Sequence, residues 1–227
     1  MTITLVTGAN KGIGYETAKQ LVDQGHTVYL GARNIERGAA AADRVGARFV
    51  QLDVTDDASV DAALAVIDDA EGRLDVLVNN AGILETDLTG AAALRAFDTN
   101  AVGFVRVTQA ALPLLRKSAS PSVLTVSSSA GSFWATTNPE RPEYGLAAPL
   151  YSASKAAATM LTVQYAKAHP DIRFNALEPG TTATDLTAGL GIGRPVADSA
   201  RAVVRLATLG ADGPTGTLQD ELGELPW

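Results

Sequence analysis

Apolar and polar positions follow two alternating patterns along the chain: short aliphatic or β-branched runs, and longer Ala-rich segments of helical period. The apolar runs predict seven strands, at residues 2–7, 27–32, 48–53, 75–80, 122–128, 172–178 and, more weakly, 216–220. The Ala-rich segments predict helices at residues 12–24, 34–45, 57–71, 90–117, 150–168 and 197–209. Near-continuous apolar strands separated by helices predict an α/β fold with a doubly wound parallel sheet covered by helices on both faces. Ligands are then expected beyond the carboxyl ends of the strands.

The end of the first predicted strand carries the glycine-rich stretch TGANKGIG, residues 7–14. Gly8, Gly12 and Gly14 allow a tight turn and a close approach of the backbone to a ligand. The helix that follows presents free N–H groups and the positive end of its dipole to a pyrophosphate. A purely structural turn explains one glycine more easily than three. The strand, loop and helix together therefore predict the dinucleotide-binding fingerprint of a Rossmann fold.

The end of the second predicted strand bears on which dinucleotide binds. NAD-binding proteins usually place an acidic residue there, on the ribose 2′-hydroxyl. This chain has Gly31 and Ala32 at that place, followed by Arg33, and Lys11 lies in the glycine loop. Two cations without a carboxylate favour the 2′-phosphate of NADP(H) over NAD(H). The alternative is that Arg33 is a solvated charge at the strand end.

Length and composition suit one globular domain, because the chain has 227 residues, 46% of them hydrophobic and 19% charged. A net charge of −7 without a long Lys/Arg cluster argues against nucleic acid and anionic membranes as partners. The chain has no cysteine, and His26 and His169 are far apart, so neither a disulfide framework nor a zinc site is predicted. The first residues, MTITLVTGAN, lack a signal-peptide pattern, so we expect a cytoplasmic protein.

The stretch PLYSASKAAATML, residues 149–161, places Tyr151 and Lys155 four positions apart in a predicted helix. Positions i and i+4 lie on one helix face, so the phenol and the ammonium would be neighbours. Taken alone, the pair has a more ordinary explanation, in which the ring packs and the amine reaches water. Its meaning depends on the rest of the chain.

Seven short motifs occur in an order that resembles the short-chain dehydrogenase/reductase family over essentially the whole chain. They are TGANKGIG (7–14), LDV (52–54), NNAG (79–82), TNAVG (99–103), VSSSAG (126–131), YSASK (151–155) and PG (179–180). The NK of the glycine loop, the GAR strand end and an extended segment before Tyr151 are most similar to the monomeric carbonyl-reductase branch.

The resemblance implies a role for each matching residue. The catalytic residues would be Asn100, Ser128, Tyr151 and Lys155, with Ser128 taken from three consecutive serines because it lies three positions before Gly131. Asn10, Lys11 and Arg33 would lie by the 2′-phosphate. The full set of cofactor-binding residues would be Gly8, Asn10, Lys11, Gly12, Ile13, Gly14, Arg33, Asp53, Val54, Asn80, Ala81, Gly82, Tyr151, Lys155, Pro179, Gly180, Thr182 and Thr184.

These residue types suit the reduction of a carbonyl group. A carbonyl that accepts hydride becomes an alkoxide and needs a proton donor, which Tyr151 can provide. A phenol has a pKa near 10, so an ammonium on Lys155 at about 5 Å is expected to lower the pKa of Tyr151 by about two units. Ser128 would hydrogen-bond the substrate oxygen, and Asn100 would anchor a water that relays protons to Lys155. The alternative for Asn100 is a bond to local backbone in a bent helix.

One departure from the family pattern is the distance between Ser128 and Tyr151. They are 23 positions apart, which is longer than usual, so SFWATTNPERPEYGLAAPL contains an irregular, Pro-rich insertion. Its aromatic residues would either wall an apolar substrate pocket or pin the loop to the body of the protein. These aromatic residues are Phe133, Trp134 and Tyr144.

A second departure is the glycine-rich segment 184–198, which is short where related enzymes carry a substrate lid. Glycines of this kind suit a loop that closes on the cofactor, or a disordered one. The candidate apolar contacts in it are Leu186, Leu190 and Ile192.

The sequence favours an NADP(H)-dependent reductase of a small neutral ketone, aldehyde or quinone, running in reverse as an alcohol dehydrogenase. The alternative is a nucleotide-sensing protein of the same fold without turnover, although such regulators typically lack the tyrosine and lysine pair. A purely structural subunit would not need the glycine loop. A homo-oligomer, dimer or tetramer, is favoured slightly over a monomer.

Overall fold

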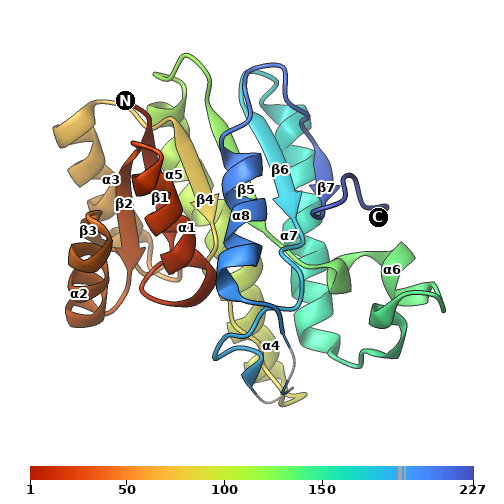
Figure 1. The fold of residues 1–227 in the computed structure, drawn as a ribbon. Coiled ribbons are helices and arrows are strands. Elements are labelled where there is room, and N and C mark those ends of the chain that lie inside the picture. The colour runs from red at the N-terminus through yellow and green to blue at the C-terminus, as the bar shows by residue number, and fades with distance from the viewer. Residues whose placement is uncertain (189–190, 192) are drawn as a thin grey trace.

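The computed structural model describes residues 1–188, 191 and 193–227. Its centre is a seven-stranded sheet in which all strands run parallel, in the order β3-β2-β1-β4-β5-β6-β7 (Figure 1). The strand order reverses between β1 and β4, which creates the switch point where α/β proteins bind ligands. The strands are β1 (Ile3–Thr7), β2 (Thr27–Ala32), β3 (Arg48–Gln51), β4 (Val76–Asn79), β5 (Ser122–Val126), β6 (Arg173–Leu177) and β7 (Thr217–Gln219). The predicted fold class is confirmed.

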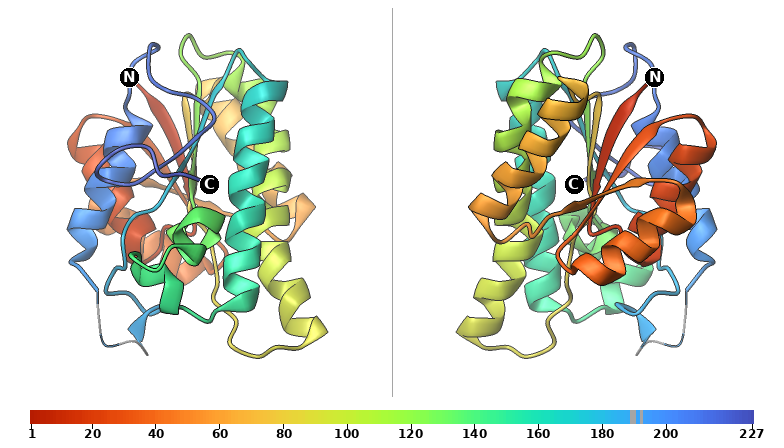
Figure 2. Two further views of the ribbon diagram at one scale, coloured as in Figure 1. Left: turned by 90° about the vertical axis from the view of Figure 1, so that its right-hand side faces the viewer. Right: turned by 90° about the vertical axis from the view of Figure 1, so that its left-hand side faces the viewer.

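Helices cover both faces of this sheet (Figure 2). One layer is formed by α1 (Gly12–Asp23), α2 (Ile35–Val45) and α8 (Val196–Ala207). The other is formed by α3 (Asp57–Glu71), α5 (Gly103–Leu115) and α7 (Pro149–Ala168). Two shorter helices, α4 (Gly90–Phe97) and α6 (Phe133–Thr137), lie toward the carboxyl end of the strands. These two helices therefore flank the carboxyl edge of the sheet, where the ligand site is expected.

The strands are apolar because both of their faces are buried. In β1, Leu5 packs in the core under α3, α5 and α7, whereas Val6 packs in the core under α1, α2 and α8. Leu77 and Val78 alternate in the same way in β4. This alternation is the period of two that a strand imposes, with apolar residues at both positions because the sheet has no solvent face.

Local signals fix several helix ends. The side chains of Asn34, Asp56 and Thr89 accept hydrogen bonds from the first turns of α2, α3 and α4. Such caps satisfy N–H groups that have no partner within the helix. Gly46 and Gly72 end α2 and α3 in the left-handed conformation, at φ of 73° and 69°.

Two predicted segments differ in the structure. The predicted helix 90–117 is divided into α4 and α5 by a π-helical turn, Asp98–Val102, in which the Gly103 N–H donates to the carbonyl of Asp98. The insertion is less irregular than expected, because it contains α6 and a 3₁₀ turn, Pro142–Gly145. Hydrophobic periodicity alone does not reveal a π turn, because the same residues continue the helical pattern on both sides of it.

Gly131 lets α7 pass directly over the turn that follows β5. A Cβ at this position would lie 2.6 Å from the backbone nitrogen of Ala156 and 2.7 Å from the carbonyl carbon of Lys155. We expect Gly131→Ala to lower the free energy of unfolding by about 1–3 kcal/mol, because backbone must move to make room. Thermal unfolding would report a loss of roughly 2–4 °C for each kcal/mol.

Gly145→Ala is the matched control for this substitution. No heavy atom described by the structure lies within 4 Å of a Cβ built at Gly145. Its unfolding temperature should stay near that of the wild type. Equal unfolding temperatures for the two variants would show that α7 does not need the glycine.

No helix among the described residues is both long enough and apolar enough to cross a membrane.

Candidate active site

The carboxyl ends of β1 and β4 are joined through Thr7. Its hydroxyl accepts hydrogen bonds from the backbone N–H groups of Asn80 and Ala81, each at 3.0 Å. In return, the side-chain amide of Asn80 donates to the carbonyl of Thr7 at 2.8 Å. Asn80 thus bridges the two central strands and holds the NNAG loop beside the glycine loop at the switch point.

The glycine loop is pressed against this NNAG loop. Gly8 has a φ of 63°, and a Cβ there would lie 2.9 Å from the Cα of Ala81. A Cβ on Gly14 would overlap the side-chain amide of Asn80 and lie 3.0 Å from the Cα of Ala9. Both positions therefore need glycine for close packing.

The N-terminus of α1 suits an anion. Among the described residues, no side chain caps this end, where Lys11 is the N-cap, and the first turn holds no acidic residue. Its N–H groups and the positive end of the helix dipole are thus left for an external acceptor, as a pyrophosphate would require. Gly12 and Ile13 begin this first turn, and Asn10 directly precedes the N-cap.

The two cations predicted for a 2′-phosphate lie in different settings. Arg33 is exposed directly after β2, whose last residues Gly31 and Ala32 are buried. Lys11 is paired with Asp185 at 2.6 Å, across 174 positions of sequence. Asp185 belongs to the segment that follows β6, so this pair ties that segment to the glycine loop.

Asp53 and Val54 lie in the loop that follows β3. The Asp53 carboxylate accepts from the N–H of Thr55 at 3.0 Å and from its hydroxyl at 2.7 Å. Burial alone would raise the pKa of Asp53, but these two bonds and the nearby Arg33 and Arg106 hold it below its usual value. Val54 is buried, and its carbonyl accepts from Arg106 at 2.6 Å.

Of the three serines after β5, Ser128 alone has an accessible side chain. Ser127 is buried and shares a 2.6 Å hydrogen bond with Thr159. Ser129 is buried as well. The Ser128 hydroxyl accepts from the N–H of Ala130 at 3.2 Å, and it lies near enough to the Tyr151 hydroxyl to lower the pKa of that phenol. The serine selected from the sequence is thus the one that reaches the tyrosine.

Tyr151 and Lys155 lie on the face of α7 that turns toward the sheet. The Lys155 amine is 5.7 Å from the centre of the Tyr151 ring and donates to the carbonyl of Val126, at the end of β5, at 2.8 Å. Lys155 is only 5% exposed. Burial lowers the pKa of Lys155 to about 8, which a nearby carboxylate, Glu178, partly opposes.

The expectation that Lys155 lowers the pKa of Tyr151 is wrong for this structure. Burial raises the pKa of Tyr151 to about 12, Glu178 adds to the rise, and the nearby Ser128 hydroxyl opposes it. The reason is that the helix buries the phenol as well as the amine. Loss of hydration then outweighs the attraction that the spacing alone predicts.

Asn100 lies in the π-helical turn and bonds across the site. Its amide donates to the carbonyl of Ile83 at 2.9 Å and to the hydroxyl of Ser154 at 2.9 Å, and its oxygen accepts from the Ile83 N–H at 2.8 Å. These partners are distant in sequence, so the expected alternative of a bond to local backbone does not apply. A Cβ on Gly82 would lie 3.4 Å from both the Asn100 oxygen and the Lys155 amine.

A cavity of about 10 Å³ lies between these residues, with Asn100, Lys155, Thr7 and Val126 among its lining. This is close to the smallest volume that holds one water molecule. Asn100, Ser128, Tyr151 and Lys155 thus come together from three separate elements, at the carboxyl edge next to the glycine loop.

The model of the short chain dehydrogenase family matches residues 2–194. The chain belongs to this family. It is 34% identical to (−)-isopiperitenone reductase of Mentha piperita, over 93% of this chain and 94% of that protein. Among solved structures, NADPH-bound carbonyl reductase from chicken fatty liver is 27% identical, with a TM-score of 0.87 over 100% of both chains. Salutaridine reductase from Papaver somniferum is also 27% identical, with a TM-score of 0.86 over 96% of this chain and 99% of that one.

Membership in this family makes the chain an oxidoreductase. Its similarity to ketone reductases supports a carbonyl reductase activity in general.

The structure shows how this dehydrogenase arranges the segment after β6. Gly180 has a φ of 79°. The buried Thr182 donates to the carbonyl of Gly180 at 2.7 Å and shares a 2.5 Å bond with Ser199, so its hydroxyl is engaged within the protein. The methyl group of Thr184 lies over Gly12 in the glycine loop.

Backbone hydrogen bonds join the two ends of the glycine-rich segment that was expected to form either a closing loop or a disordered one. Ala183 donates to the carbonyl of Arg194 at 3.0 Å, and Arg194 donates to that of Thr181 at 2.9 Å. Gly193 makes this approach possible, because a Cβ there would lie 2.6 Å from the carbonyl carbon of Thr182. Of the candidate apolar contacts, Leu186 is 39% exposed, whereas Leu190 and Ile192 lie outside the described residues.

The three aromatic residues of the insertion are all exposed, Phe133 at 76%, Trp134 at 38% and Tyr144 at 57%. The backbone N–H of Trp134 donates to a backbone oxygen of Trp227 at 2.8 Å, which pins this part of the loop. The Trp134 ring also lies under the guanidinium of Arg141 in the same insertion, 5.6 Å away.

Sequence reasoning did not single out Thr7, Glu178 or Asp185. Thr7 is one threonine in a strand, and nothing in its neighbours marks the bonds that it makes to Asn80. Glu178 carried a signal, since it is an acidic residue at the end of the predicted strand 172–178, directly before Pro179.

Proposed function

We propose that this dehydrogenase reduces a small neutral ketone, aldehyde or quinone to the alcohol with NADPH. The observation that carries the proposal is the convergence of Asn100, Ser128, Tyr151 and Lys155 beside a glycine loop that suits a pyrophosphate. These groups provide a proton donor, a donor to the carbonyl oxygen and a cation in one place.

Tyr151 would donate the proton. Because burial raises the pKa of Tyr151 to about 12, it keeps its proton at neutral pH, which is the form that reduction needs. The hydroxyl of Ser128 would hold the carbonyl oxygen next to that proton. When bound, the reduced nicotinamide would supply hydride to the carbonyl carbon.

Lys155 would stabilise the phenolate that remains on Tyr151. With a pKa of about 8, its amine is mostly charged at neutral pH. Proton return to Tyr151 would pass by Lys155, and the cavity between Lys155 and Asn100 has room for the water that such a relay requires.

The residues predicted to hold the cofactor surround the switch point. We propose that the glycine loop with Ile13 holds the pyrophosphate, Asn10, Lys11 and Arg33 the 2′-phosphate, and Asp53 with Val54 the adenine. The nicotinamide side would be lined by Asn80, Ala81, Gly82, Pro179, Gly180 and Thr184. Thr182 would act indirectly, because its hydroxyl is bonded to Gly180 and Ser199. The NADPH-bound state of the carbonyl reductase from chicken fatty liver supports NADP(H) over NAD(H).

We further propose a homo-oligomer, which light scattering on the purified protein would test. Two exposed apolar side chains support it, Val102 at 44% and Met160 at 58%, on the layer formed by α5 and α7. A cytoplasmic location also stays a prediction.

The proposed function is tested by titrating the purified protein with NADPH and NADH, and then following NADPH oxidation with a panel of ketones, quinones and aldehydes. We expect NADPH to bind at least about ten-fold more tightly than NADH, because a charge-assisted phosphate contact contributes this much. Turnover with part of the panel is also expected. Selective binding with no turnover across a broad panel would favour the nucleotide-sensing alternative, and no binding of either nucleotide would overturn the proposal.

A further inference from the structure

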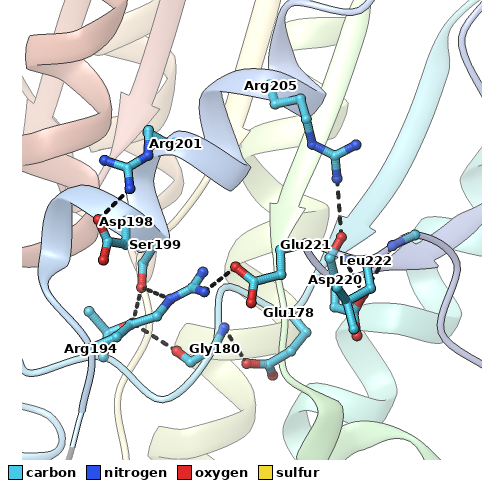
Figure 3. A network of polar contacts seen from close by, with 12 residues as sticks. Glu178, Gly180, Arg194, Asp198, Ser199, Arg201, Arg205, Asp220, Glu221 and Leu222 are labelled. Carbon is cyan, nitrogen blue, oxygen red and sulfur yellow. Dashed lines mark hydrogen bonds and ion pairs between the residues drawn. The ribbon is translucent and has the colours of Figure 1, made fainter.

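The carboxylate of Glu178 joins two turns at the carboxyl edge of the sheet. Glu178 directly follows β6, and one of its oxygens accepts from the N–H of Gly180 at 2.6 Å. The other oxygen accepts from the N–H of Ser129 in the turn after β5. Its own N–H donates to the carbonyl of Gln219, the last residue of β7, at 2.7 Å. Figure 3 shows the carboxylate next to the Gly180 backbone.

The bond to Ser129 acts on the peptide group that directly follows Ser128. Holding this peptide fixes the backbone that carries the Ser128 hydroxyl, which faces Tyr151. A carboxylate has two acceptor oxygens and can serve both N–H groups at once, whereas a glutamine has only one oxygen. A carboxylate at this position can therefore accept from Ser129 and Gly180 at the same time.

We propose that Glu178 is a positioning residue of the reductase, which holds Ser128 in place by joining the serine turn to the Pro179–Gly180 turn. The proposal rests on the function proposed above, because it places Glu178 behind the same Ser128 and Tyr151.

The same carboxylate also acts on the tyrosine and the lysine by its charge. Glu178 raises the pKa of both Tyr151 and Lys155, in each case as a contribution second to burial. A neutral residue at this position would not exert this effect. Removing the charge of Glu178 should therefore lower the pKa of Lys155, and this change can be measured.

Other charged groups surround Glu178 and have to be separated from it. Glu143 of the insertion faces the hydroxyl of Ser129. On the other side, the Arg194 guanidinium lies against Gly180 and is paired with Glu221, as Figure 3 shows. Glu221 is thus a second carboxylate in the same network that makes no bond to the serine turn.

The test compares Glu178→Gln with Glu221→Gln as its matched control. We expect Glu178→Gln to reduce kcat for the carbonyl substrate by roughly ten-fold to a hundred-fold, because a small displacement of Ser128 spoils the alignment. The dissociation constant for NADPH should change less than kcat, since the glycine loop that is proposed to hold the pyrophosphate is untouched. Glu221→Gln should keep the wild-type kcat.

A second measurement needs neither substrate nor cofactor. Nuclear magnetic resonance of the lysine side chains, assigned with Lys155→Met, follows the titration of Lys155, which in the wild type has a pKa of about 8. Because Glu178 raises this pKa, Glu178→Gln should move the midpoint to lower pH, and Glu221→Gln should not. Wild-type kcat and midpoint in Glu178→Gln would overturn the proposal, as would equal changes in both variants.

If Glu178→Gln does not fold, Glu178→Asp decides the question. It keeps the charge but shortens the reach, so we expect a reduced kcat with a Lys155 midpoint near that of the wild type. An unchanged kcat in Glu178→Asp would overturn the proposal. The wild-type protein in the same assay separates failure of the reductase function from failure of the Glu178 role. If the wild type shows no turnover, the proposed function fails and the role of Glu178 fails with it. If the wild type turns over and the Glu178 variants keep its kcat, only the role of Glu178 fails.

Discussion

Tyr151→Phe is expected to abolish carbonyl reduction, with a loss in kcat of about a thousand-fold, the size typical of a missing general acid. The substitution removes the hydroxyl next to Ser128 and leaves the ring in place beside Lys155. Phenylalanine cannot give a proton to the oxygen of the substrate. NADPH binding should be retained, because the glycine loop and Arg33 are unaffected. Stopped-flow measurement of NADPH oxidation, together with a binding titration, checks both statements.

Tyr15→Phe is the control for this loss. Tyr15 lies in α1, where its ring faces the Arg44 guanidinium at 5.6 Å, away from the proposed proton path. Removing its hydroxyl should leave kcat near the wild-type value. Retained turnover in Tyr151→Phe would show that the proton comes from another group, and Tyr151 would then be a packing residue.

The parts of the site that sequence could predict are those fixed by backbone requirements. Gly8 lies against the backbone of Ala81 and Gly14 lies against the side chain of Asn80, so neither position has space for a side chain and both are visible as glycines in the sequence. Tyr151 and Lys155 are likewise placed by helix geometry, because four positions always bring two side chains to one face. A parallel sheet then brings all strand ends to one edge.

The parts that sequence could not predict depend on distant side chains and on burial. Lys11 meets Asp185 across 174 positions, and no local pattern announces such a pair. The high pKa of Tyr151 comes chiefly from loss of hydration around its hydroxyl, which the spacing of Tyr151 and Lys155 does not specify. The π-helical turn that aims Asn100 also leaves the hydrophobic pattern intact. Such features arise from tertiary packing.

Arg33→Ala is expected to weaken NADPH binding by about 10-fold to 100-fold, the value of one charged hydrogen bond to a phosphate. NADH has no 2′-phosphate, so its affinity should remain near that of the wild type. Arg33 stands exposed after a strand that ends in Gly31 and Ala32, where no carboxylate would repel the phosphate. Parallel fluorescence titrations with the two nucleotides give the ratio directly.

Lys11 is the second cation proposed for the 2′-phosphate, but unlike the exposed Arg33 it already has a carboxylate beside it. Its amine is already paired with Asp185 at 2.6 Å, so a phosphate would have to compete with that carboxylate. Arg33 should therefore carry most of the selectivity. Arg116→Ala is the control, because it removes the same charge after α5, beyond the amino end of the strands. Equal losses for NADPH and NADH in Arg33→Ala would mean that Arg33 does not touch the 2′-phosphate, and a matching loss in Arg116→Ala would mean that only net charge matters.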